Sequence, residues 1–134
     1  MNIKFIATHI ESGEKYPYKN DGKINYEDIV LPPNHQFILK IDHPLTKPAI
    51  FKFNSGLKGI TRHQLSEKIR RFYKKVYKDE DKSVGHKTSY IKGMFNRGFS
   101  DGKYGIWGHY IGDLVLVGAN VLSDENVIEL EVDS

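Results

Sequence analysis

The feature that most constrains the fold of this chain is an amphipathic helix predicted over residues 61–78. Thr61 and Gln64 have the three-residue spacing of a capping box, in which each side chain binds the backbone N–H of the other. Apolar residues then recur at steps of three and four, which places them on one side of a helix. They are Leu65, Ile69, Phe72, Tyr73 and Val76. We expect the helix to fade in the charged run at residues 79–82.

The opposite side of this helix is strongly basic. Residues 61–78 contain seven basic side chains and a single acid, Glu67. The basic residues are Arg62, Lys68, Arg70, Arg71, Lys74, Lys75 and Lys78. Positive charge gathered on one surface attracts polyanions and contacts phosphates without reading bases. We therefore expect these residues to bind nucleic acid, either DNA or RNA, and the alternative is a solvated helix face without such a role.

Charge is divided unevenly along the chain, whose net charge is +3. Residues 1–103 carry 20 basic and 11 acidic side chains, a balance of +9. Residues 104–134 carry six acids and no Lys or Arg, a balance of −6. Such a division suggests a basic working surface with an acidic region elsewhere. The alternative is that the acidic segment lies beside the basic helix and neutralises it within the fold.

The remaining signals are mostly those of strands. Apolar runs predict strands at residues 2–10, 15–18, 36–41, 49–53, 113–122 and 127–132. Thr88–Phe99 predicts a second, shorter helix, and a turn signal between the last two strands predicts a C-terminal hairpin. This order, without regular βαβ alternation, is typical of α+β proteins. We expect a single domain, residues 1–134, with an antiparallel sheet packed against one long amphipathic helix, a second short helix and the C-terminal hairpin.

A second candidate surface is the glycine- and aromatic-rich segment at residues 95–112. Glycine lets the backbone approach a partner closely, and aromatic rings stack on bases or form hot spots of protein interfaces. The candidate stacking or partner-binding residues are Phe99, Tyr104, Trp107 and Tyr110. For Trp107 itself we favour a place in the core, because a lone Trp is usually packed.

Residues 104–114, YGIWGHYIGDL, and the Gly-Ile-Thr-Arg helix start at residues 59–62 carry a family resemblance. Roughly residues 59–118 resemble uncharacterised small proteins of large DNA viruses and protists. The resemblance implies no activity and lends no functional residues. It suggests a viral protein.

Signatures of catalysis and metal binding are lacking. The six His residues show neither an HExxH motif nor paired ligand spacing, and the chain has no Cys for a disulfide or a cysteine zinc site. His109 and Asp113 could pair as an acid/base dyad, although a His that anchors a loop through a carboxylate is commoner. We therefore expect neither an enzyme nor a metal or cofactor.

The N-terminus and the overall hydropathy indicate an intracellular protein. No apolar run approaches the roughly 20 residues of a membrane span. His9 and Glu11 come too early for the apolar region of a signal peptide. The preferred function is that of a small nucleic-acid-associated protein in the cytoplasm, nucleus or virion. The alternative is a protein-interaction module, for instance a structural virion subunit, that uses residues 95–112.

Overall fold

The computed structural model describes residues 1–17, 21–84 and 98–134. Six strands form the main sheet in the order β2-β1-β7-β8-β4-β5, and β3 and β6 form a separate two-stranded sheet. The strands are β1 (Asn2–His9), β2 (Lys15–Tyr16), β3 (Ile29–Leu31), β4 (Gln36–Ile41), β5 (Ala49–Asn54), β6 (Ile60–Thr61), β7 (Val115–Leu122) and β8 (Val127–Asp133). The helices of these described ranges are α1 (Arg62–Ser83) and the two 3-10 helices η1 (Asp21–Lys23) and η2 (Ile111–Asp113).

The main sheet is mixed because its two halves join through a parallel pair of strands. β7 pairs with β1 and with β8 in antiparallel fashion, so the predicted C-terminal hairpin is confirmed. β4 and β5 form a second antiparallel hairpin. The halves meet where β8 runs parallel to β4, with Ile128 opposite Leu39.

The fold class predicted from the sequence is wrong. The described residues are mostly β, with a mixed six-stranded sheet, a small second sheet and one α-helix, in place of an antiparallel sheet packed against a long helix with a second short one. Local periodicity identifies strands but not their partners, and the parallel pair joins segments almost 90 residues apart. The second helix, expected at Thr88–Phe99, lies outside the described residues except for Gly98 and Phe99, which are not helical.

α1 begins where the sequence predicts and ends later. Thr61 is the N-cap and forms the capping box with Gln64, which confirms the predicted start. The helix runs through the charged residues 79–82 to Ser83 because tertiary contacts support its last turn. Glu80 is fully buried, and the Ser83 hydroxyl accepts a hydrogen bond of 2.7 Å from the N–H of Lys103.

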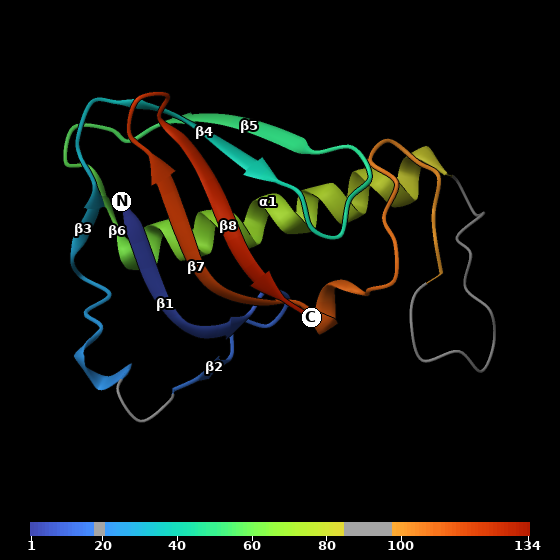
Figure 1. Ribbon diagram of the computed structural model, residues 1–134, viewed down its shortest axis with the longest axis horizontal. Coiled ribbons are helices and arrows are strands. Elements are labelled where there is room, and N and C mark those ends of the chain that lie inside the picture. Colours follow the sequence, from blue (N-terminus) through green and yellow to red (C-terminus); the bar gives the residue numbers. More distant parts are fainter. Residues whose placement is uncertain (18–20, 85–97) are drawn as a thin grey trace.

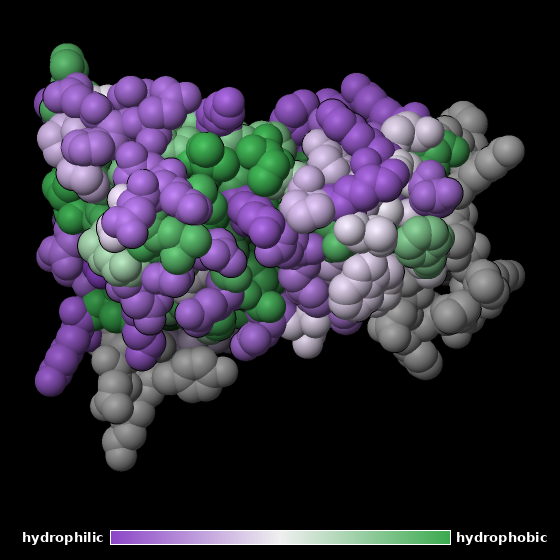
Figure 2. Space-filling model, turned by 45° about the horizontal axis from the view of Figure 1, so that its top comes forward, coloured by the Kyte–Doolittle hydropathy of each residue, from purple (hydrophilic) through white to green (hydrophobic). Residues whose placement is uncertain are grey.

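One side of α1 and the inner face of the main sheet contribute to a single hydrophobic core. Leu65, Ile69, Tyr73 and Val76 are all fully buried, as their spacing predicts. In Figure 1 α1 runs behind the strands, and its C-terminal part extends past them toward the orange segment that precedes β7. Figure 2, in which the top of Figure 1 with β4 and β5 is turned forward, shows green apolar residues interspersed with purple hydrophilic ones. Among the described helices, none is long and apolar enough to cross a membrane.

Candidate nucleic-acid interface

The first turn of α1 does not offer its backbone N–H groups to a ligand. The N–H groups of Arg62 and His63 donate to carbonyl oxygens of the loop before β3 at 2.9 and 3.0 Å. The N–H of Gln64 donates to Thr61 Oγ1 at 3.1 Å. Helix N-termini bind anions through such groups when they are unpaired. Any anion held near the start of α1 is therefore bound by side chains.

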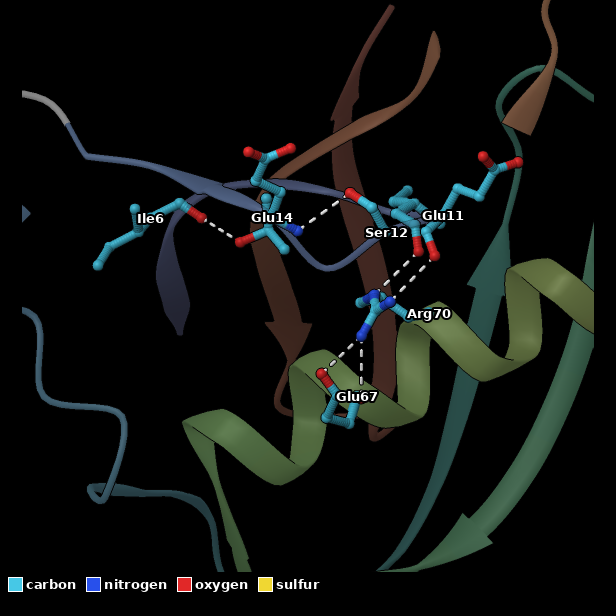
Figure 3. Close-up of polar contacts among 8 residues, drawn as sticks. Ile6, Glu11, Ser12, Glu14, Glu67 and Arg70 are labelled. Carbon is cyan, nitrogen blue, oxygen red and sulfur yellow. Dashed lines mark hydrogen bonds and ion pairs between the residues drawn. The ribbon is translucent and has the colours of Figure 1, made fainter. Parts of the chain in front are cut away.

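Arg70 lies between α1 and the turn that joins β1 to β2, and its guanidinium is fully engaged there (Figure 3). Its Nε donates to the carbonyl oxygen of Ile10 at 2.9 Å and its Nη2 to that of Glu11 at 3.1 Å. Its Nη1 donates to both carboxylate oxygens of Glu67 at 2.7 and 3.0 Å. Only 11% of the side chain is exposed. Arg70 therefore ties the turn to the helix and is not available to phosphates.

Two more of the predicted cations, Arg62 and Lys68, already make contacts with other residues of the fold. The side chain of Arg62 is 15% exposed, donates to the carbonyl oxygen of Asn25 and pairs with Asp28 at 3.3 Å. Lys68 is half-buried, and its ammonium lies 5.1 Å from the ring centre of Phe53. A cation–π contact of this kind holds the ammonium in place but leaves its N–H groups able to donate. Arg62 is thus structural, whereas Lys68 stays a candidate ligand-binding residue.

The other four predicted cations are exposed along one line of α1. Lys82 lies on the same line but was not predicted, because the helix was expected to end at residue 78. These five residues form the cationic stripe. Its members are Arg71, Lys74, Lys75, Lys78 and Lys82. The stripe extends over about 16 Å, since each helical residue rises about 1.5 Å. Lys75 pairs with Asp79 at 3.0 Å, and no ion pair within the described ranges joins the other four to a carboxylate.

Two acids of the C-terminal segment, Glu129 and Glu131 of β8, lie on the face of the sheet that points away from α1. Ile128 of β8 is fully buried in the core that α1 shares. Successive side chains of a strand point to opposite faces, so Glu129 and Glu131 face away from that core. In the part of the chain that the structure describes, no ion pair joins an acid of residues 104–134 to α1. Within the described residues, the C-terminal hairpin therefore does not neutralise the basic helix.

A groove of about 450 Å³ opens at the N-terminal end of the cationic stripe. It lies between the end of β5 and the first three turns of α1, and its lining includes Asn54, His63, Gln64, Lys68 and Arg71. Arg71 belongs to both the groove and the stripe, so the two surfaces are continuous. Sequence reasoning missed this groove because no local pattern shows that the end of β5 lies beside α1.

Glu80 anchors the second candidate surface to the last turn of α1. Its buried carboxylate accepts a hydrogen bond of 2.6 Å from the Ser100 hydroxyl and four more from backbone N–H groups. These N–H groups belong to Gly102, Tyr104, Gly105 and Ile106. Burial acts to raise the pKa of Glu80, but the hydrogen bonds outweigh it and hold the pKa below its ordinary value. The carboxylate thus stays ionised and fixes residues 100–106.

Two of the four predicted aromatic residues are exposed, and they flank this anchored segment. Phe99 is 50% exposed and Trp107 is 43% exposed, whereas Tyr104 is buried and Tyr110 is half-buried. The expectation that Trp107 lies in the core is therefore wrong. Ile106 fills the core instead, paired with the β4–β5 loop in an isolated bridge, and the next side chain along this extended backbone points outward.

His109 and Asp113 are not joined as the dyad hypothesis requires. The ring of His109 lies 5.4 Å from that of His43 and 6.0 Å from that of Trp107, centre to centre. The carboxylate of Asp113 accepts a hydrogen bond of 3.1 Å from the N–H of Tyr110. Burial, followed by the charge of His109, lowers the pKa of His43. Over the described ranges, no group of three or more His, Asp or Glu side chains could hold a metal ion.

Comparison of the chain with protein-family models, with curated proteins and with solved structures finds no match. The resemblance of roughly residues 59–118 to small viral and protist proteins therefore stays a prediction. The proposal of a function below therefore rests on the arrangement of the side chains.

Proposed function

We propose that this protein binds nucleic acid through the cationic stripe of α1. The observation that supports this is the exposure of five cations along about 16 Å of one helix, supported beneath by a fully buried apolar side. A rigid line of positive charge raises the local concentration of a polyanion and can contact successive phosphates. Fewer cations are proposed to bind phosphate than the seven predicted from the sequence, because Arg62 and Arg70 make hydrogen bonds within the fold.

Binding of this kind is dominated by phosphate contacts and depends strongly on salt. Phosphate contacts position a protein on a strand but carry no sequence information directly. Each phosphate contact on a single strand adds about −0.7 to the slope of log K against log salt concentration. Five contacts give a slope of about −3.5. We therefore expect weak sequence preference together with a steep loss of affinity as salt rises.

The test compares two triple variants that each remove three positive charges. The stripe variant is Lys74→Gln, Lys75→Gln and Lys78→Gln, and the control variant is Lys23→Gln, Lys47→Gln and Lys52→Gln. All six lysines are exposed, and the control lysines lie outside α1. Fluorescence anisotropy with a labelled single strand gives the affinity at several salt concentrations. The stripe variant should lose about 2 from the salt slope, whereas the control variant should lose much less. Equal effects of the two variants would refute the proposal.

The alternative function, a protein-interaction module, has one observation in its favour. Phe99 and Trp107 expose large rings at the two ends of the segment that Glu80 holds in place. Aromatic residues on an ordered surface are typical binding hot spots. A partner bound there should lose affinity in Trp107→Ala and should respond little to salt, since apolar contacts are not screened. The stripe variant should leave that affinity unchanged.

A further inference from the structure

The groove beside the stripe presents hydrogen-bond donors, because its side-chain oxygens are already in use. Asn54 Oδ1 accepts the N–H of Gly56 at 2.8 Å, which fixes the orientation of the amide. Gln64 Oε1 accepts the N–H of Thr61 at 2.9 Å in the capping box, which fixes the second amide. Both NH₂ groups are thereby left to donate. An amide whose oxygen is held in this way acts toward a ligand as a donor.

The charged residues of the groove also make it suitable for an anion. Both carboxylate oxygens of Glu67 accept from Arg70, so this acid is neutralised by a guanidinium outside the groove lining. Lys68 and Arg71 then leave two positive charges facing the groove, and His63 beside them is exposed. The groove is therefore suited to an anion that accepts several hydrogen bonds.

We infer that this groove binds the terminal phosphate of a nucleic-acid strand whose remaining phosphates lie along the cationic stripe. This inference rests on the proposed function. A terminal phosphate monoester carries about −1.5 to −2 charge at pH 7 and three strong acceptor oxygens, whereas a phosphate inside a strand carries only −1. Two cations and two oriented amides match the monoester better. The volume of about 450 Å³ lies within the range of small-ligand sites and leaves room for the attached sugar.

The variant that tests the groove changes its donors without removing the contacts on which the fold depends. Asn54→Asp and Gln64→Glu keep the oxygens that accept from Gly56 and Thr61, and Glu is itself a capping-box residue. Each substitution replaces an NH₂ donor by a negatively charged oxygen. The control is the same change of amide to carboxylate at two exposed residues of β1 and β7, Asn2→Asp with Asn120→Asp, strands that β8 and β4 separate from β5.

The assay measures the affinity of one single strand of about 12 nucleotides prepared with 5′-hydroxyl, 5′-phosphate or 3′-phosphate ends. The parent protein should bind one phosphorylated end about tenfold more tightly than the hydroxyl end, since charge-assisted hydrogen bonds to phosphate are the strong class. The preferred end shows the direction of the strand. This ratio should fall to about one in the groove variant and persist in the control. The stripe variant should weaken all three strands and keep the ratio, because Arg71 and Lys68 are unchanged.

The assay distinguishes an error in the proposed phosphate site from an error in the proposed binding of nucleic acid by the stripe. A ratio near one in the parent protein, or an unchanged ratio in the groove variant, would overturn the groove assignment even if the strands bind. If no strand binds, titration with inorganic phosphate decides the matter through the NMR signals of the side-chain amides. Shifts of the Asn54 and Gln64 side-chain amides in the parent protein, together with phosphate-dependent shifts of the Lys68 and Arg71 backbone amides that are lost in the groove variant, would support the phosphate site alone. An absence of such shifts would overturn it.

Discussion

Replacing Glu80 by Gln should destabilise the protein by about 4 kcal/mol, although the two side chains have nearly the same shape. One carboxylate oxygen accepts from the N–H groups of Tyr104 and Gly105, and the other from those of Gly102 and Ile106 and from a hydroxyl. Whichever oxygen becomes NH₂, two backbone N–H donors lose their acceptor, and at least one of them is fully buried. Each such loss costs about 1–3 kcal/mol.

Urea unfolding at neutral pH measures this loss. With a slope of about 2 kcal/mol per molar urea, the midpoint should fall by about 2 M. The single tryptophan, Trp107, follows the anchored segment directly and reports its release by fluorescence. In Glu80→Gln the fluorescence transition should precede the loss of secondary structure seen by circular dichroism, since the freed segment can open locally.

The control for this prediction is Asp79→Asn on the same turn. Asp79 makes a single ion pair with the exposed Lys75, and exposed pairs of this kind stabilise proteins little. Its midpoint should stay close to that of the parent protein. A Glu80→Gln variant as stable as Asp79→Asn would show that the five hydrogen bonds do not hold the segment, and the reasoning would then be refuted.

Three further predictions concern stability. The pKa of Glu80 is lower in the folded state than in the unfolded state, so the stability that it contributes is present above pH about 4.5 and is lost as the pH falls through the folded pKa. Urea midpoints measured from pH 6 down to pH 3 should show this loss in the parent protein and much less of it in Glu80→Gln. Gly13→Ala should cost about 2 kcal/mol in the same assay, because Gly13 has φ +79° and its new Cβ would lie 2.7 Å from the Arg70 guanidinium. Tyr73→Phe should cost about 1 kcal/mol, because the buried hydroxyl donates to the carbonyl oxygen of His43 at 2.8 Å; an unchanged midpoint would show that this bond adds nothing.

Much of the secondary structure could be predicted because it depends on local patterns. The strand expected at residues 36–41 is found as Gln36–Ile41, and the strand expected at residues 127–132 is found as Val127–Asp133. The start of α1 was predictable for the same reason, since Thr61 and Gln64 bind each other. The end of α1 was not, because it depends on hydrogen bonds between Glu80 and residues 20 to 26 positions later. Strand partners and the class of the sheet are non-local in the same way.

The roles of single side chains in the candidate site could not be predicted from the local sequence either. Arg70 and Arg71 are neighbours in the sequence and have the same chemistry, so no periodicity argument assigns them different roles. A helical step of about 100° turns Arg70 under the β1–β2 turn and leaves Arg71 exposed. The difference depends on where β1 and β2 lie, which the local sequence of α1 does not encode.

The position of Glu80 on α1 links the two candidate surfaces through one helix. Its backbone lies between Lys78 and Lys82 of the cationic stripe, whereas its side chain turns inward to hold residues 100–106. Since the last turn of α1 extends past the strands, these hydrogen bonds support it where the sheet no longer does. Loss of the Glu80 anchor should therefore loosen the turn that presents Lys82 as well as the loop that presents Trp107. The stripe and the aromatic segment share a structural support, even if they bind different partners.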